Sequence, residues 1–278
     1  MPASADNPGL QNVGRLALVG AGKMGGAMLQ AWLRLGLDPR NVAVLEPQPS
    51  PELAALAGKG LNLNPDSRDF GAFAVVVLAV KPQAAADMLR AQRALFGPGT
   101  LVVSIMAGLT LKFLQAHCPQ AAIVRAMPNT PAAIGRGVTV AVADPQVTSA
   151  QRAVAQALLA ATGSAEWVSD ESLMDAVTAV SGSGPAYVFL LTEALAQAGV
   201  AAGLPAPLAE KLARETVSGA GELLRQSTLA PGVLRQNVTS PGGTTAAALE
   251  KLMAPDGLAA LMEKAVRAAA ARSRELAG

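Results

Sequence analysis

The stretch Leu16-Ala17-Leu18-Val19-Gly20-Ala21-Gly22-Lys23-Met24-Gly25 decides the fold class of this chain. Four apolar residues indicate a short strand, and the G-x-G-x-x-G spacing leads directly into residues with helical periodicity. In such a strand–turn–helix unit the first glycine allows a sharp turn, the second lets a pyrophosphate approach the backbone, and the third lets the helix pack on the strand. The N-terminus of the helix adds free N–H groups and a positive dipole end.

This stretch therefore predicts a dinucleotide site, with an ordinary glycine-rich βα turn as the alternative. We assign Gly20, Gly22, Lys23, Met24 and Gly25 to cofactor contact.

The first part of the chain alternates between short apolar strands and amphipathic helices. Several of the strands are apolar on both faces, which is typical of a parallel sheet covered by helices on both sides. We expect strands at 16–19, 41–45, 74–80, 101–105, 123–127, 138–142 and 166–168, and helices at 23–35, 51–57, 82–95, 109–117 and 149–161. The pattern predicts an α/β fold, a Rossmann-type doubly wound and mostly parallel sheet.

The second part contains no convincing strand. Helices are expected at 172–180, 186–202, 206–226 and 259–276, with a further helix after residue 245. We therefore divide the chain into a disordered tail at 1–14, a Rossmann dinucleotide-binding domain at 15–168 and an all-helical domain at 169–278.

Composition excludes several classes of function. The net charge of +2 gives no argument for a nucleic-acid partner or an anionic membrane. The single cysteine, Cys118, forbids an intramolecular disulfide and is interpreted as a small buried residue, consistent with a cytoplasmic protein. The single histidine, His117, excludes histidine triads and multi-histidine metal sites, and we expect no metal. Neither a signal peptide nor a membrane-spanning helix is recognisable.

Further candidate residues follow strands of the first part. Glu46 ends the second strand, where an acidic residue accepts hydrogen bonds from the adenosine ribose and repels a 2′-phosphate, which favours NADH. Val80-Lys81-Pro82 joins a strand to a helix N-terminus near the expected phosphates. Met127 and Asn129 lie in a loop made rigid by two prolines. Each of these also has a purely structural interpretation, as a surface charge or a turn residue.

Two loops of the second part carry small and hydroxyl residues before a helix. Ser183 precedes a long helix in Ser181-Gly182-Ser183-Gly184-Pro185. In Ser240-Pro241-Gly242-Gly243-Thr244-Thr245, the two glycines can present backbone N–H groups as a nest for a carboxylate or phosphate. Helix capping alone is compatible with both loops.

Together these motifs resemble the pyrroline-5-carboxylate reductase family, over nearly the whole chain after residue 14. The matching blocks are 20–25, 77–83, 104–108, 125–131, 181–187, 193–195 and 240–245, and the last three are the most specific. The chain departs from the family pattern at Asp66-Ser67, where Asp-Asn is common, and at Ala74, where an acidic residue is common.

The resemblance implies reduction of 1-pyrroline-5-carboxylate to L-proline, the last step of proline biosynthesis, with NAD(P)H as hydride donor. It implies a Rossmann domain and a helical dimerisation domain, a homodimer that can assemble into larger rings, and a preference for NADPH. By this match Ser183, Ser240, Gly242, Gly243 and Thr244 contact the substrate. Thr245 approaches the ring nitrogen as the catalytic residue, and Ala107 joins the cofactor contacts.

The chemistry of the reaction agrees with a site that lacks histidine. An imine nitrogen is basic, so the substrate can arrive protonated, and no strong general base is needed. Orientation against the hydride donor can supply roughly 7–11 kcal/mol of the barrier.

Two alternatives remain open at the level of sequence. A β-hydroxyacid dehydrogenase would use a catalytic lysine of the helical part, for which Lys211, Lys251 and Lys264 are candidates. A nucleotide-binding regulatory subunit without turnover would need no carboxylate nest.

Overall fold

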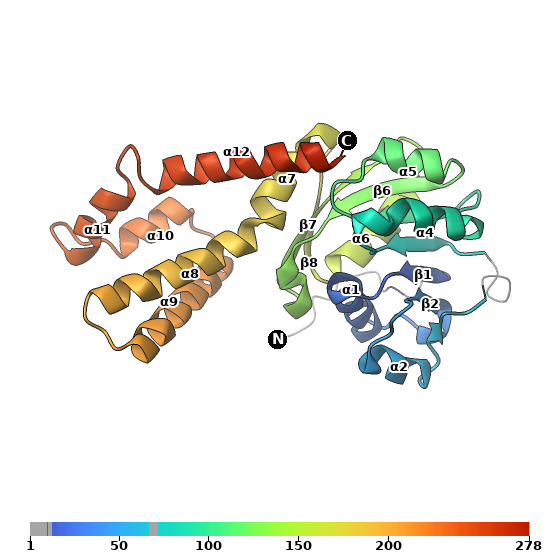
Figure 1. The fold of residues 1–278 in the computed structure, drawn as a ribbon, viewed down its shortest axis with the longest axis horizontal. Coiled ribbons are helices and arrows are strands. Elements are labelled where there is room, and N and C mark those ends of the chain that lie inside the picture. Colours follow the sequence, from blue (N-terminus) through green and yellow to red (C-terminus); the bar gives the residue numbers. More distant parts are fainter. Residues whose placement is uncertain (1–9, 11–12, 67–71, 278) are drawn as a thin grey trace. The chain divides into compact units, whose positions relative to one another are not determined.

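The computed structural model describes residues 10, 13–66 and 72–277 of the 278-residue chain (Figure 1). Two compact units are present. The first comprises Met1–Gly182 together with Ala270–Gly278, and the second comprises Ser183–Ala269. We describe each unit by itself.

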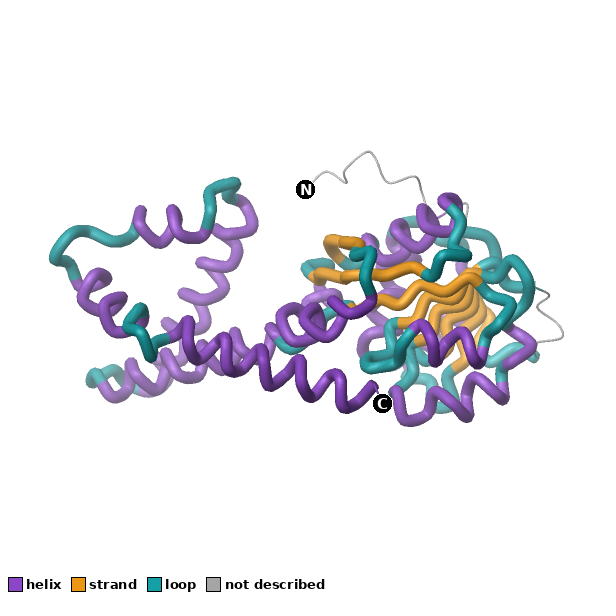
Figure 2. Tube along the Cα trace, turned by 90° about the horizontal axis from the view of Figure 1, so that it is seen from above, coloured by secondary structure: helices purple, strands orange, loops and turns teal. Residues whose placement is uncertain are grey.

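The first unit is built on one eight-stranded sheet, with the spatial order β3-β2-β1-β4-β5-β6-β7-β8. The strands of this sheet are drawn in orange in Figure 2. The strands are β1 Leu16–Val19, β2 Val42–Leu45, β3 Asn62–Leu63, β4 Val75–Leu78, β5 Leu101–Ser104, β6 Ala122–Met127, β7 Gly137–Ala143 and β8 Gly163–Trp167. All neighbouring strands are parallel except β6 and β7, which are antiparallel. The order reverses at β1, the point at which doubly wound sheets bind their ligands.

Side chains alternate between two apolar layers because successive strand residues face opposite sides of the sheet. On β1, Leu16 and Leu18 belong to the first apolar layer, which also contains Trp32 of α1 (Lys23–Arg34) and Leu158 of α6 (Ser149–Ala160). Ala17 and Val19 join the opposite layer, with residues of α4 (Ala85–Ala91) and α5 (Leu111–His117). Both faces of the sheet are thus covered, which explains why its strands are apolar throughout. The helix α2 (Pro51–Ala57) adds Leu53 to the first layer.

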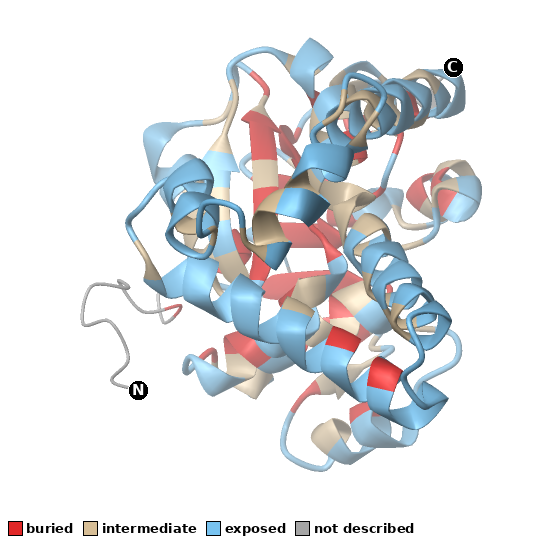
Figure 3. Ribbon diagram, turned by 90° about the vertical axis from the view of Figure 1, so that its left-hand side faces the viewer, coloured by how far each residue is buried: buried red, intermediate tan, exposed pale blue. Residues whose placement is uncertain are grey.

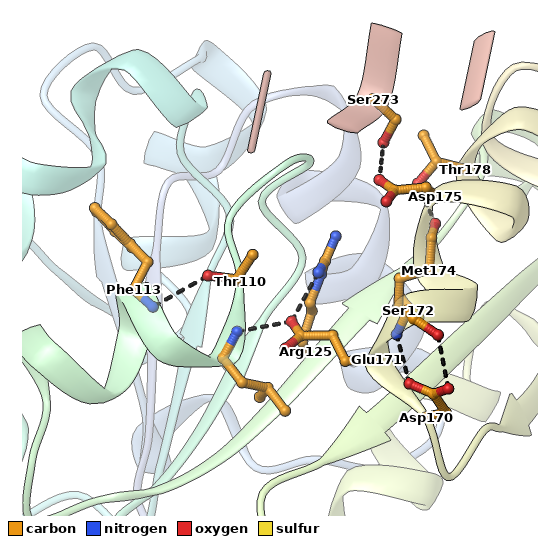
Figure 4. Close-up of polar contacts among 11 residues, drawn as sticks. Thr110, Phe113, Arg125, Asp170, Glu171, Ser172, Met174, Asp175, Thr178 and Ser273 are labelled. Carbon is orange, nitrogen blue, oxygen red and sulfur yellow. Dashed lines mark hydrogen bonds and ion pairs between the residues drawn. The ribbon is translucent and has the colours of Figure 1, made fainter. Parts of the chain in front are cut away.

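Polar contacts fix the segment that follows β8 to the sheet (Figure 4). This segment consists of η6 (Glu171–Leu173), α7 (Met174–Val177) and the π-helical turn η7 (Thr178–Gly182). The Glu171 carboxylate accepts hydrogen bonds from Arg125 Nη1 and from the Leu111 N–H, both at 2.7 Å. Ser273, near the end of α12, donates to Asp175 Oδ1 at 2.7 Å.

The second unit is helical. It contains α8 (Gly184–Ala201), α9 (Ala206–Gln226), α10 (Pro231–Asn237), α11 (Thr244–Leu252) and most of α12 (Leu258–Ala277). Its residues are far more exposed than those of the sheet (Figure 3). No residue of α8 is buried, and Phe189, Leu190 and Leu191 are 62%, 63% and 50% exposed.

The fold class predicted from the sequence is confirmed, both for the mostly parallel Rossmann-like sheet and for the helical part without strands among residues 170–277. Several details of the elements were wrong. The two-residue β3 and the helix α10 were not predicted, and β8 begins at Gly163 rather than 166. The expected helix at 82–95 is divided into η3 (Pro82–Ala84), α4 and η4 (Arg93–Leu95), and the one at 172–180 is divided into η6, α7 and η7.

Most of the predicted tail at 1–14 lies outside the described residues, as does Ser67. Leu10 and Val13 are described, and both are buried in the first apolar layer.

Candidate functional site

The three glycines of the loop between β1 and α1 meet three different surroundings. Gly20 has a φ of +91°, and an added Cβ would lie 2.8 Å from the carbonyl oxygen of Ala79. At Gly25 an added Cβ would overlap the Gly20 carbonyl oxygen and lie 3.0 Å from Ala79 Cβ. At Gly22 it would meet no atom within 4 Å. The sharp turn and the close helix–strand packing are therefore present as predicted, and Gly22 faces open space.

That open space belongs to a cleft of about 540 Å³ at the N-terminus of α1. Its lining residues are Ala21, Gly22, Lys23, Gly26, Ala27, Gln30, Glu46, Gln48, Ser50, Glu52 and Ala133. Gly22 is the N-cap of α1, and no side chain caps it. The cleft thus combines a helix N-terminus with open room for a bound anion, which fits the phosphates of a dinucleotide.

Glu46 lies at the carboxyl end of β2 and is held from several sides. Its Oε2 accepts a hydrogen bond from the Ala21 N–H at 2.8 Å, and its Oε1 accepts one from the Gln48 N–H at 3.1 Å. The carboxylate is therefore attached to the glycine loop itself. Each carboxylate oxygen can accept a second bond, so the group can still receive ribose hydroxyls.

The other predicted cofactor residues lie at the same edge of the sheet. Lys81 is exposed and precedes Pro82 at the start of η3, directly after β4 and Val80. Ala107 is exposed in the loop after β5, and Met127 ends β6 in a half-buried position. Parallel strands present their carboxyl ends at one edge, and ligands of such sheets bind there.

Asn129 is mostly buried in the loop after β6. Its Oδ1 accepts a hydrogen bond from the Val138 N–H at 2.9 Å, which ties the rigid loop to β7. This contact gives Asn129 a structural role.

The predicted substrate residues lie in the second unit, at the starts of two helices. Ser183 is the half-buried N-cap of α8. In the loop before α11, Gly242 has a φ of +68°, and the Gly243 N–H donates to the Ser240 carbonyl oxygen at 3.1 Å. Gly243 is the N-cap of α11, with no side-chain cap, and Thr244 and Thr245 form the first turn. This turn leaves N–H groups of the helix start available to an anion.

The remaining reactive side chains have structural roles. Cys118 is fully buried, and desolvation raises its pKa to about 12. His117 Nδ1 lies 2.9 Å from the carbonyl oxygen of Phe113, at the end of α5. Among the described residues no group of three or more metal-ligating side chains occurs. No helix in the described part of the chain is both long enough and apolar enough to cross a membrane.

Comparison with known proteins matches both parts of the chain. Residues 171–276 match the family model for pyrroline-5-carboxylate reductase dimerisation, and residues 15–108 match that for NADP oxidoreductase, coenzyme F420-dependent. The pyrroline-5-carboxylate reductase of Synechocystis is 42% identical over 267 residues, which cover 94% of this chain and 98% of the relative. The chain belongs to the pyrroline-5-carboxylate reductase family.

Other members of the pyrroline-5-carboxylate reductase family agree with this placement. The enzyme of Pseudomonas aeruginosa is 41% identical, with 95% of this chain and 97% of the relative covered. The solved pyrroline-5-carboxylate reductase of Coxiella burnetii superposes with a TM-score of 0.88 at 34% identity, covering 96% of this chain and all of that one. The Plasmodium falciparum enzyme, solved with NADP bound, gives 0.81 at 28% identity, with 97% and 100% covered.

Sequence reasoning missed one residue beside the cofactor cleft of this family member. Asn64 follows β3 and is the only described residue other than glycine with a positive φ, at +47°. Its side-chain amide pairs with the backbone of Glu46. The Asn64-Pro65 pair is a turn signal, but nothing in the sequence identifies the partner of the Asn64 side chain.

Proposed function

We propose that this chain reduces 1-pyrroline-5-carboxylate to L-proline with a hydride from NAD(P)H. The observation that carries the proposal is the extent of the similarity, which spans 94% of this chain and 98% of the Synechocystis relative at 42% identity. A match of that length includes both the glycine loop of the first unit and the Ser240–Thr245 loop of the second. The cleft at Gly22 adds independent support, because it provides room for a dinucleotide at a helix N-terminus.

In this proposal the glycine loop of the first unit binds the cofactor, and the Ser240–Thr245 loop of the second unit binds the substrate. A bound nicotinamide cofactor would supply the hydride. The backbone N–H groups at the start of α11 would hold the substrate carboxylate, and Ser183, Ser240, Gly242, Gly243 and Thr244 would line its position. The Thr245 hydroxyl would hydrogen-bond to the ring nitrogen. The residues contribute orientation rather than strong acid–base chemistry, since the imine nitrogen is itself basic.

The choice between NADPH and NADH is part of the proposal. One matching family is described as an NADP oxidoreductase, and the Plasmodium structure contains NADP. Glu46 supports the opposite preference in this chain, because a carboxylate at the end of β2 repels a 2′-phosphate. We propose that NAD(H) is the preferred cofactor.

We further propose that the helical part, residues 169–278, forms a homodimer that can assemble into larger rings in the cytoplasm. Supporting this, α8 is apolar along its length yet has no buried residue in the single chain. Large exposed apolar surfaces mark sites of association. Light scattering of the purified protein would test this assembly, and a monomer at micromolar concentration would contradict it.

The activity is tested by adding 1-pyrroline-5-carboxylate to the protein with NADH or NADPH and following the loss of absorbance of the reduced cofactor. Turnover with at least one cofactor is expected. Folded protein that oxidises neither would refute the proposed function. Oxidation of a β-hydroxyacid with NAD⁺ or NADP⁺ instead would favour the dehydrogenase alternative, although Lys211, Lys251 and Lys264 are all exposed on their helices.

The role of Thr245 is tested by comparing three variants. We expect Thr245→Ala to lower kcat at least tenfold while the Kd for the cofactor stays within about twofold. Thr245→Ser, which keeps the hydroxyl, should retain most of the activity. Thr239→Ala is the matched control, because the Thr239 hydroxyl donates to the Arg235 carbonyl oxygen at 2.7 Å and lies outside the proposed substrate contacts. Equal loss of activity in Thr245→Ala and Thr239→Ala would remove the proposed role.

A further inference from the structure

Asn64 has an unusual backbone conformation that serves a specific contact. Its φ of +47° places it in the left-handed region, which asparagine tolerates better than most residues. Its N–H donates to the Val44 carbonyl oxygen at 2.7 Å, which continues the pairing of β3 with β2 for one more residue. The side chain then reaches beyond the end of the short strand.

The side-chain amide of Asn64 binds both backbone polar groups of Glu46. Asn64 Oδ1 accepts from the Glu46 N–H at 2.8 Å, and Asn64 Nδ2 donates to the Glu46 carbonyl oxygen at 2.9 Å. A planar amide that makes two bonds to one residue fixes both its position and its orientation. The backbone from which the Glu46 carboxylate projects is thereby held in place.

The side chain of Glu46 is held as well as its backbone, because its carboxylate accepts hydrogen bonds from the N–H groups of Ala21 and Gln48. Glu46 therefore makes four hydrogen bonds, two through its backbone and two through its side chain. Movement of the carboxylate out of the cleft, to make room for a second anion, would break both of its hydrogen bonds. Such preorganisation is what binding sites use to discriminate between similar ligands.

The charges that line the cleft reinforce this discrimination. Glu46 and Glu52 contribute two carboxylates, whereas Lys23 is the one basic residue among the lining residues in the described chain. A 2′-phosphate adds close to two negative charges at neutral pH and is usually met by arginine. A ribose 2′-hydroxyl, in contrast, can donate a hydrogen bond to a fixed carboxylate.

We propose that Asn64 is a positioning residue that holds Glu46 in place, and that the pair makes this site select NAD(H) against NADP(H). This inference rests on the proposed function only in that the cleft binds a nicotinamide dinucleotide. It assigns to the turn after β3 a role in cofactor choice, although Asn64 itself does not line the cleft.

The test measures Kd for NAD⁺ and for NADP⁺ by isothermal titration calorimetry, without substrate, in four proteins. The wild type should bind NAD⁺ roughly tenfold or more tightly than NADP⁺, because the fixed carboxylate repels the phosphate. Glu46→Ser should abolish most of that ratio. Asn64→Gly removes the amide but still permits the positive φ, and it should reduce the ratio at least threefold, mainly by weakening NAD⁺.

Asn62→Ala is the matched control. Asn62 lies on β3, two residues before Asn64, and its Nδ2 donates to the carbonyl oxygens of Arg40 and Val42, at the opposite end of β2 from Glu46. Its ratio of dissociation constants should equal that of the wild type, and thermal melting of all four proteins would confirm that they are folded.

Three results would overturn the proposal. The first is a wild type that prefers NADP⁺, and the second is an unchanged ratio in Asn64→Gly. The third is the same reduction in Asn62→Ala, which would indicate a general effect of disturbing β3. Failure of the proposed function has a different signature: the dinucleotides bind with the expected ratio, but 1-pyrroline-5-carboxylate is not reduced.

Discussion

Adding one methyl group at Gly25 or at Gly22 should separate the structural role of the glycine loop from its role in binding. At Gly25 the new Cβ overlaps the carbonyl oxygen of Gly20. That oxygen belongs to the backbone of the turn and cannot rotate away. To restore an ordinary contact of 3.4 Å or more, α1 must move away from β1 by about 1 Å.

This displacement has a cost that can be worked from the packing of α1. The helix places Met28, Leu29 and Trp32 in the first apolar layer, each at most 1% exposed. Overpacking of a well-filled core costs about 1–3 kcal/mol, and a backbone clash belongs at the upper end of this range. Replacing glycine by alanine within a helix returns up to about 1 kcal/mol. We therefore expect Gly25→Ala to lower the free energy of unfolding by about 2 kcal/mol or more.

Gly22→Ala is the matched variant. Its methyl group meets no protein atom within 4 Å, and the φ of −64° suits any residue. Stability should stay within about 1 kcal/mol of the wild type, since loss of the glycine N-cap is offset by a less flexible unfolded chain. The methyl group borders the cleft, however, and should weaken dinucleotide binding about tenfold, or 1.4 kcal/mol.

Urea denaturation followed by tryptophan fluorescence measures the stability term. Trp32 and Trp167 are the two tryptophans of the chain, and both belong to the first unit, so the signal reports on the unfolding of the sheet. Calorimetric titration with NAD⁺ and NADP⁺ measures the binding term. Gly25→Ala with wild-type stability would refute the packing argument. Gly22→Ala with wild-type affinity would show that no phosphate lies over Gly22.

Three further predictions concern stability. Glu171→Gln should lower the free energy of unfolding by about 2 kcal/mol, because the Arg125 guanidinium, whose side chain is 6% exposed, loses its charged partner. Glu275→Gln is the control: it disrupts an exposed pair with Arg272 and should cost less than about 0.5 kcal/mol in the same urea titration. Trp32→Phe should cost about 2–3 kcal/mol, measured by circular dichroism, since it opens a void in the core and leaves the Leu158 carbonyl oxygen without the indole N–H at 2.8 Å. The third concerns pH: because the pKa of the buried Cys118 thiol is raised from 9.0 to about 12, the unfolded chain ionises first. The wild type should therefore lose about 1.4 kcal/mol per pH unit above pH 9 relative to Cys118→Ala, and equal slopes for the two proteins would contradict this.

The parts of the fold that could be predicted are those in which one pattern has one physical solution. Strands apolar on both faces, such as Val75–Leu78, require helices on both sides, and the structure has them. The strand β3 was missed because two residues are too few to show an alternation. The sequence predicts the helix α8 but does not indicate which of its faces is buried, because the helix is apolar on nearly all sides. A helix of this kind is typically covered by another chain.

The candidate site, like the fold, could be predicted from the sequence only in part. The spacing predicted the sharp turn at Gly20, the close helix–strand packing at Gly25 and the position of Glu46 at the end of β2, and the structure has all three. The contacts of Asn64 depend on its φ and on how far β2 extends past β3, and neither is written in a local pattern. The contact of the Met127 methyl group with Gly182 likewise joins residues that are far apart in the sequence.

The hydrogen bond from the Ala21 N–H to Glu46 limits which backbone N–H groups of the cleft are available to a phosphate. A loop that uses the Ala21 amide to hold a carboxylate does not offer that amide to a phosphate. The anion must then be received further along, by the N–H groups at the start of α1, next to the open space at Gly22. In the proposed cofactor site, the choice of cofactor and the binding of its phosphates would therefore both depend on the Glu46 carboxylate. Removing Glu46 frees an N–H donor at the same time as it removes a negative charge, and both changes favour a ligand with an additional phosphate.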